Sequence, residues 1–254
     1  MTSPRFFSPF PLVVGEHVEL SESAARHAVR VLRLKAGDAL VLFDGRGGEY
    51  AACISRCARD TVFAEVREWR DVECESPLDL TLVQALQSGE KMDFTVQKAA
   101  ELGVNRIVPV ASRRSVVRLE GERALRRVAH WRAVAASACE QCGRNRVPEI
   151  SDLKGLHHWL AVPSGAERTM RLMLEPGASC SLDTLPRPGS GTTVELLIGA
   201  EGGLAPEEVD LARQAGFVSV RLGPRVLRTE TAGLATLAAI QCLWGDFSGG
   251  AGDV

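Results

Sequence analysis

The chain contains 254 residues, of which 45% are hydrophobic and 24% are charged, and its formal net charge is −2. This length is sufficient for two ordinary domains with separate cores. No apolar run reaches the roughly 18 residues that a membrane-spanning helix requires, and residues 1–5 lack the apolar core of a secretory signal. Seven cysteines suit a reducing compartment better than a disulfide framework, so we expect a cytoplasmic protein with no membrane partner.

Residues 1–75 have the pattern of a small β-barrel with one helix. Short alternating runs bounded by turn residues predict strands at 17–20, 39–43, 50–54 and 61–66. A helix is expected over 23–34, and Arg26, Arg30 and Arg33 are spaced so that they share one stripe on it. This stripe is suited to phosphate contact, although it is equally consistent with simple solubility.

From residue 76 onward, strands and helices alternate, so we expect two domains at 1–75 and 76–254. The expected strands are 80–86, 106–110, 169–174, 193–198 and 217–222, and the expected helices are 88–102, 120–142, 206–215 and 229–244. This alternation is typical of a mainly parallel sheet with helices on both faces. The last helix is apolar almost all round, and such a helix is usually buried in its own core or against a second subunit.

Positive charge is concentrated in residues 106–146, which contain 10 basic and 3 acidic side chains. A local patch of this kind attracts phosphate groups even when the whole molecule is slightly acidic. A solvated helix face explains the same charge equally well, so both interpretations stand. Arg144 and Arg146 lie beyond the long helix on a loop, where functional residues concentrate.

Two glycine-containing loops follow the strands at 193–198 and 217–222. The first reads GAEGGL at 199–204, and the second reads LGPRVLRTETA at 222–232. Because the carboxyl ends of parallel strands share one edge, both loops are expected where open α/β sheets bind ligands. Glycine lets a flat ligand approach the peptide groups closely, so these loops are the candidate binding site.

The loops do not match the common phosphate-binding patterns. Neither G-x-G-x-x-G nor G-x-x-x-x-G-K-[ST] occurs in them. The helix after the first loop starts with Pro206, Glu207 and Glu208, and these acids would compete with a phosphate for the helix dipole. The pair Cys139 and Cys142 has no second pair or companion histidines, so no metal site is expected.

Together these segments resemble the RsmE family, bacterial methyltransferases of the knotted SPOUT class that methylate uracil N3 in small-subunit ribosomal RNA. The motifs that carry the resemblance are RVLR at 30–33, GEKMD at 89–93, QK at 97–98, ELGV at 101–104, CEQCGR at 139–144 and the two glycine loops. They span nearly the whole chain. Ala200 departs from the pattern, because the family usually has proline there, and the loss of that ring is expected to loosen the turn.

The resemblance implies an α/β fold in which a PUA-like small β-barrel at 1–75 precedes a SPOUT-type parallel sheet with a deep trefoil knot at 76–254. It also implies a homodimer, S-adenosylmethionine as cofactor without a metal, and small-subunit ribosomal RNA as partner, either free or in the assembled subunit. The expected cofactor contacts are Leu174, Leu197, Ile198, Gly199, Glu201, Gly202, Gly203, Leu222, Gly223, Pro224, Leu227, Arg228, Thr229, Glu230 and Thr231. The expected RNA contacts are Arg26, Arg30, Arg33, Arg113, Arg114, Arg144 and Arg146.

The chemistry that the resemblance implies restricts the catalytic candidates. Uracil N3 carries a proton at neutral pH, so its methylation requires removal of that proton and stabilisation of the charge that develops on O2 and O4. Arg228 and Arg144 are candidates for stabilising the charge, and Glu230 for accepting the proton. Alternatively, Glu230 is an acid that caps the first turn of its own helix. The target uridine must be unpaired or turned out of its stack.

Two other functional classes remain open from the sequence. A non-catalytic factor that binds ribosomal RNA or assists its assembly would keep the basic patch and the barrel. A small-molecule enzyme that uses another nucleotide would bind that nucleotide in place of S-adenosylmethionine. Thermal stabilisation by a panel of cofactors separates these classes from a methyltransferase.

Overall fold

The computed structural model describes residues 3–58, 61–162 and 168–247 of the chain. By its internal contacts the chain divides into two compact units. The first unit is Met1–Glu75 with Ala136–Val147, and the second unit is Ser76–Ala135 with Pro148–Val254. The expected domains, 1–75 and 76–254, differ from these units in that residues 136–147 belong to the first unit. Within the described ranges, no helix is long and apolar enough to cross a membrane.

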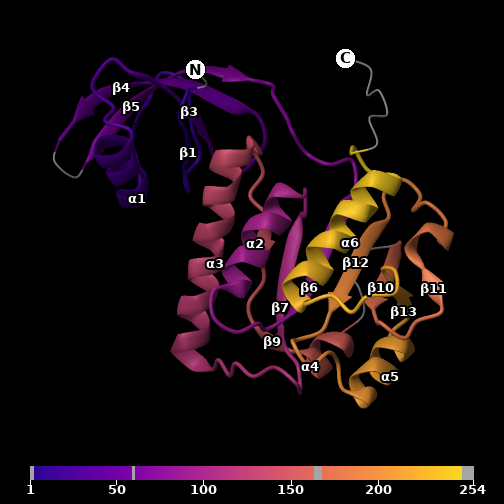
Figure 1. Cartoon of the computed structure of the whole chain (residues 1–254). Helices are drawn as coiled ribbons and strands as arrows, with labels where there is room; N and C mark the ends of the chain where they lie inside the picture. Colours follow the sequence, from indigo (N-terminus) through magenta and orange to yellow (C-terminus); the bar gives the residue numbers. More distant parts are fainter. Residues whose placement is uncertain (1–2, 59–60, 163–167, 248–254) are drawn as a thin grey trace. The chain divides into compact units, whose positions relative to one another are not determined.

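The first unit contains a five-stranded curved sheet with the strand order β1-β3-β4-β5-β2 (Figure 1). Its strands are β1 (Arg5–Phe7), β2 (His17–Glu19), β3 (Ala39–Phe43), β4 (Glu49–Cys57) and β5 (Val62–Arg70). β1 is parallel to β3, and the other pairs are antiparallel. Register shifts at Ala51/Ala52 and Ile54/Arg56 interrupt the pairing of β4 with β5, and such irregularities bend a sheet. The sequence did not predict β1, because three residues are too few to show an alternating pattern.

The helical segment of the first unit is shorter than the expected helix over 23–34. Helix α1 (Glu22–Arg26) starts after Ser21, whose hydroxyl accepts a hydrogen bond from the Ala24 N–H at 3.3 Å. It continues into a π-helical turn, η1 (His27–Val31). Arg33 then has φ of +57°, a conformation uncommon outside glycine, so the helical segment ends before it.

The second unit contains an eight-stranded sheet in which the path β11-β13-β10-β12-β6-β7-β8 is joined by β9 beside β7. Its strands are β6 (Asp79–Ala85), β7 (Arg106–Ala111), β8 (Glu149–Ile150), β9 (Lys154–Gly155), β10 (Thr169–Leu174), β11 (Cys180–Ser181), β12 (Thr193–Ile198) and β13 (Val218–Arg221). The described pairings are all parallel. The predicted α/β fold with a parallel sheet is therefore confirmed. The carboxyl ends of β10, β12 and β13 meet at one edge, because β10 pairs with both of the others.

Helices cover both faces of this sheet (Figure 1). They are α2 (Lys91–Glu101), α3 (Gly121–Cys142), α4 (Leu156–Leu160), α5 (Pro206–Gln214) and α6 (Thr229–Trp244), with a short 3-10 turn, η2 (Leu182–Thr184). α2 and α6 pack together on one face, where Leu82 and Ile198 lie beside Gly233 of α6. On the other face, α4 and α5 pack on a core that includes Val83 and Leu197.

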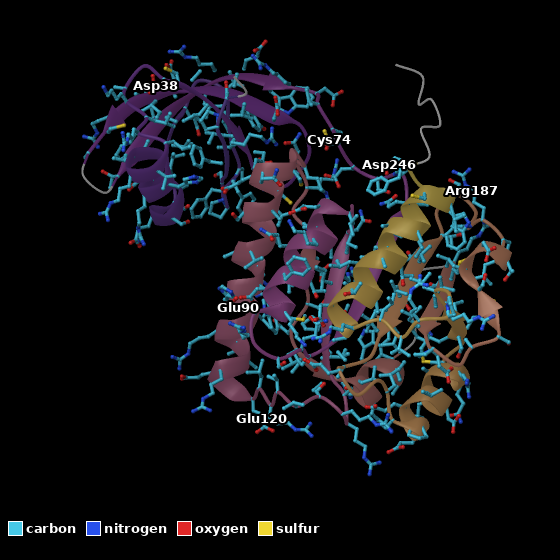
Figure 2. The ribbon with its side chains drawn as sticks, viewed as in Figure 1. Asp38, Cys74, Glu90, Glu120, Arg187 and Asp246 are labelled. Carbon is cyan, nitrogen blue, oxygen red and sulfur yellow. The ribbon has the colours of Figure 1, made fainter. Side chains whose placement is uncertain are left out.

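Helix α6 is buried on one side only. It buries Leu237, Ile240 and Trp244, whereas Leu243 is 44% exposed. Figure 2 shows Arg187 near the C-terminal end of this helix, where its guanidinium donates to the Trp244 carbonyl oxygen at 2.9 Å. A cation at this end is favourable, because the last carbonyl groups of a helix have no partner within it.

A buried ion pair holds residues 136–147 against the rest of the first unit. The Arg144 side chain is 4% exposed and that of Glu75 is 14% exposed, and Arg144 NH2 lies 2.6 Å from Glu75 Oε2. Arg144 Nε donates to the same carboxylate at 3.0 Å, and Asn145 Nδ2 donates to the Val72 carbonyl oxygen. These contacts explain why this segment belongs to the first unit although residues 136–142 are the last part of α3.

We expect Glu75→Gln to destabilise the first unit by about 3 kcal/mol, because it removes the charge that compensates a buried guanidinium. Glu68→Gln is the matched control, since Glu68 pairs with Arg70 on the surface at 2.9 Å and such pairs contribute less than about 1 kcal/mol. Urea unfolding followed by circular dichroism measures both changes. Equal effects of the two substitutions would contradict a stabilising role for the buried pair.

Candidate functional site

A cavity of about 430 Å³ lies at the edge of the second unit's sheet where β10, β12 and β13 end. Three segments after these strands form most of its wall. The lining residues are Met173, Leu174, Glu175, Pro176, Ile198, Gly199, Ala200, Glu201, Gly202, Gly203, Leu204, Arg221, Leu222, Gly223, Arg225, Val226, Leu227 and Thr229, together with Arg114, Val209 and Ala232. The structure therefore brings the two glycine loops together around one cavity, as the topology of a parallel sheet requires.

The first glycine loop is a tight turn, and its first position, residue 199, has no space for a side chain. A Cβ atom on Gly199 would lie 2.8 Å from the Gly203 carbonyl carbon and 2.9 Å from the Leu204 nitrogen. Gly203 has φ of +71°, and its N–H donates to the Ala200 carbonyl oxygen at 2.8 Å. The hydrogen bond closes the turn with alanine at position 200. All six residues of this loop, 199–204, line the cavity.

Thr229 connects the two glycine loops. Its hydroxyl donates to the Gly199 carbonyl oxygen at 2.6 Å and accepts from Gln84 Nε2 at 3.1 Å. The amide of Gln87 lies 3.2 Å from the same hydroxyl and 2.9 Å from Thr95 Oγ1. When its oxygen faces α6, this amide also accepts from the Glu230 N–H at 3.3 Å. The start of α6 is thus fixed to β6 and α2 by buried side chains instead of by a cap of its own.

Charged side chains gather beside the first glycine loop. Glu201 accepts hydrogen bonds from the Ser88 N–H at 3.0 Å and the Ser88 hydroxyl at 2.8 Å. Burial opposes its ionisation, but these hydrogen bonds and the nearby Lys91 ammonium outweigh burial, so the pKa of Glu201 lies below its usual value. Lys91 Nζ lies 3.6 Å from Glu201 Oε1 and also 3.6 Å from Glu230 Oε1.

The acids at the start of α5 are occupied by protein partners. Glu208 accepts from the Ala205 N–H at 2.9 Å and from the Arg113 N–H at 2.7 Å, and Glu207 forms an ion pair with the Arg113 guanidinium. These two acids are the ones expected to compete with a phosphate at this helix start. Arg114 NH1 donates to the Gly202 carbonyl oxygen at 2.8 Å, so a residue proposed for RNA contact lies in the cavity wall.

The cavity contains most, but not all, of the residues expected to contact a cofactor. Those that line it are Leu174, Ile198, Gly199, Glu201, Gly202, Gly203, Leu222, Gly223, Leu227 and Thr229. Those outside its lining are Leu197, Pro224, Arg228, Glu230 and Thr231. Leu197 is buried under α4 and α5, because successive side chains of a strand point to opposite faces.

Sequence reasoning missed several lining residues that follow the same strands. Glu175 and Pro176 come directly after β10, and Arg221 ends β13. Arg225 and Val226, by contrast, lie within the second glycine loop, which the sequence already indicated as part of the binding site. The rule that placed the glycine loops at the carboxyl edge applies equally to the end of β10, so it could have indicated Glu175 and Pro176.

The expected RNA contacts do not share one environment. Arg26, Arg30 and Arg33 are exposed in the first unit, where Arg26 also pairs with Glu22. Arg146 is exposed and its guanidinium lies 3.5 Å from Glu73. Arg144 is 3% exposed and paired with Glu75 in the first unit, whereas the cavity is lined by residues of the second. Its guanidinium is therefore compensated by a buried carboxylate, in contrast to the exposed arginines.

The C-x-x-C pair is part of the protein interior. Cys139 is fully buried, and a hydrogen bond with Cys142 together with burial raises the pKa of its thiol. A protonated thiol is a poor nucleophile and a poor metal ligand. Within the described ranges, no group of three histidine, cysteine or acidic side chains is arranged to hold a metal ion.

Comparison with known proteins identifies related chains over almost the full length. Residues 74–241 match the family model of an RNA methyltransferase domain, and residues 20–67 match that of an RNA methyltransferase PUA domain. Ribosomal RNA small subunit methyltransferase E of Buchnera aphidicola subsp. Schizaphis graminum is 33% identical over 96% of this chain and 98% of its own. The protein of the same name from Bacillus subtilis is 31% identical over 90% of this chain and 88% of its own.

Solved structures agree with this relationship. Ribosomal RNA small subunit methyltransferase E from Neisseria gonorrhoeae, bound to S-adenosyl methionine, is 40% identical with a TM-score of 0.88, covering 97% of this chain and 100% of its own. A Legionella pneumophila protein in complex with the bound cofactor SAM is 36% identical with a TM-score of 0.91 over the same shares. The chain therefore belongs to the ribosomal RNA small subunit methyltransferase E family, with an RNA methyltransferase PUA domain followed by an RNA methyltransferase domain.

Proposed function

We propose that this protein transfers a methyl group from S-adenosylmethionine to N3 of a uridine in small-subunit ribosomal RNA. The observation that carries the proposal is the cavity between the two glycine loops, which Thr229 connects through Gly199. The names of the relatives and the cofactor bound in the Neisseria and Legionella structures support the same activity.

The cavity suits the chemical groups of this cofactor. Its volume, about 430 Å³, lies within the range of roughly 300–1,000 Å³ typical of small-molecule sites. Leu174, Ile198 and Leu222 supply apolar surface for an adenine ring, and exposed main-chain groups of the glycine loops supply donors and acceptors for its edge. Arg114 and Glu175 offer opposite charges for the carboxylate and ammonium of the methionine part.

The residues beside the cavity suit methylation of a weakly acidic nitrogen. In the proposed reaction, a carboxylate accepts the proton from uracil N3. The N3 electron pair forms a bond to the sulfonium methyl group, and the bond between that carbon and sulfur breaks. Glu230 is the proposed proton acceptor. Arg228 lies between Leu227 and Thr229, which both line the cavity, and is proposed to stabilise charge on one of the uracil carbonyl oxygens.

RNA is proposed to bind through the first unit and through the basic segment at 106–146. Arg26, Arg30 and Arg33 are exposed on and after the helical segment of that unit, where they are placed to contact phosphates. The homodimer, the deep trefoil knot and the cytoplasmic location implied by the resemblance belong to the same proposal.

Gly199→Ala should weaken S-adenosylmethionine binding by at least about tenfold, or about 1.4 kcal/mol, because the new Cβ would collide with the main chain of Gly203 and Leu204. Gly155→Ala is the control, since a Cβ there would meet no atom within 4 Å and Gly155 lies outside the cavity lining. Isothermal titration calorimetry and cofactor-induced thermal shifts measure both. A wild-type protein with no response to S-adenosylmethionine would favour a non-catalytic RNA-binding factor.

Arg228→Ala should lower the methylation rate by about 100-fold, the usual cost of losing one donor to a developing negative charge, while cofactor affinity changes little. Arg187→Ala, at the opposite end of α6, is expected to keep the wild-type rate. Transfer of a radioactive methyl group to small-subunit ribosomal RNA gives the rate, and nucleoside mass spectrometry identifies the methylated position. Wild-type turnover in the Arg228 variant would remove this residue from the mechanism.

Arg30→Glu should weaken RNA binding and reduce the salt dependence of the affinity by about one unit of slope, because one phosphate contact is lost. Arg67→Glu makes the same charge change elsewhere in the first unit, where Arg67 is 58% exposed beside Glu65. Filter binding at several salt concentrations measures both variants. If they behave alike, only the overall charge of the unit matters.

A further inference from the structure

Three charged side chains from separate segments meet beside the cavity. Lys91 is the first residue of α2, Glu201 belongs to the first glycine loop and lines the cavity, and Glu230 lies in the first turn of α6. The Lys91 ammonium is 3.6 Å from one oxygen of each carboxylate, and its side chain is 32% exposed. The cluster thus adjoins the cavity wall and remains partly open to solvent.

Helix physics alone does not explain a lysine at this position. The start of a helix carries partial positive charge, so a cation there is unfavourable and an acid is usual. The two carboxylates offset this cost, but distances of 3.6 Å exceed the roughly 2.7–2.9 Å of a charge-assisted hydrogen bond. The Lys91 ammonium therefore lies near both carboxylates but is within hydrogen-bond distance of neither.

Glu230 has one carboxylate oxygen that lacks a hydrogen-bond donor among the described residues. This atom, Oε2, is buried. Glu230 is an acid in the first turn of α6, where no side-chain hydrogen bond caps the helix, and the Glu230 N–H is satisfied by the Gln87 amide in its better orientation. A buried acceptor without a donor is unfavourable, and a ligand with an N–H group would supply the missing donor.

The Watson–Crick edge of uracil fits this pair of side chains. It presents the N3–H donor between the O2 and O4 acceptors, so a matching surface places an acceptor beside a donor. We propose that Glu230 accepts the N3 proton while the Lys91 ammonium donates to the adjacent carbonyl oxygen, where negative charge accumulates as the proton leaves. This inference rests on the proposed function and adds a catalytic cation on α2, distinct from Arg228 at the start of α6.

The test compares Lys91→Met and Lys91→Arg with Lys98→Met in the full-length protein. Lys98 is the matched control because it lies on the same helix and pairs with Glu101 at 2.7 Å. Single-turnover methylation of small-subunit ribosomal RNA gives the rate, and calorimetry and filter binding give the cofactor and RNA affinities. Thermal unfolding shows whether each variant is folded.

We expect Lys91→Met to reduce the single-turnover rate by about 100-fold with cofactor and RNA affinities within about threefold of wild type. Lys91→Arg should recover part of the rate, since arginine retains a charged donor, and Lys98→Met should match wild type. An unchanged rate in Lys91→Met overturns the inference, as does a loss that lies entirely in cofactor affinity or folding. Failure of the wild-type protein itself to bind S-adenosylmethionine and methylate the RNA would instead overturn the proposed function.

Discussion

The hydrogen bond from the Thr229 hydroxyl to the Gly199 carbonyl oxygen, 2.6 Å long, determines how the two glycine loops face each other. It joins the start of α6 to the turn after β12, although these segments belong to different strand–helix connections. The same hydroxyl accepts from Gln84, so its donor and one acceptor site are both used. Because Thr229 is buried, breaking this contact would leave polar groups unpaired at a cost of about 1–3 kcal/mol.

Bare main chain and charged side chains both lie at or beside the cavity. Glycines leave main chain bare in part of the wall, since Gly199 has no space for a Cβ atom and Gly203 adopts a positive φ. Charged groups come from several segments: Glu201 from the first glycine loop, Lys91 from α2, Glu230 from α6 and Arg114 from the segment after β7. A rigid backbone surface can therefore hold one ligand while side chains on adjacent helices act on a second.

The sequence predicted the strands and glycine loops well because both leave local signals. Alternating and apolar runs identified the longer strands, but not β1, β8, β9 or β11, which have only two or three residues each. Strand ends followed by glycine placed Gly199 and Gly223 at one edge, where both line the cavity. Burial of loop residues was not predictable, since the partner of Arg144 is Glu75, 69 residues away. Lys91 belongs to the GEKMD motif at 89–93, but the sequence indicated no role for it, because Glu201 and Glu230 come from distant segments. The change to a π-helical turn at His27 likewise left no pattern in the sequence.

A crystal structure of the full chain with S-adenosylmethionine is the most direct test of a backbone-lined cofactor site. The methyl donor should lie between residues 199–204 and 222–229, with its adenine edge bonded to main-chain groups of these loops. Its methyl group should point toward the side where Lys91 and Glu230 meet. A donor bound elsewhere in the protein, or glycine loops that separate when it binds, would contradict this assignment.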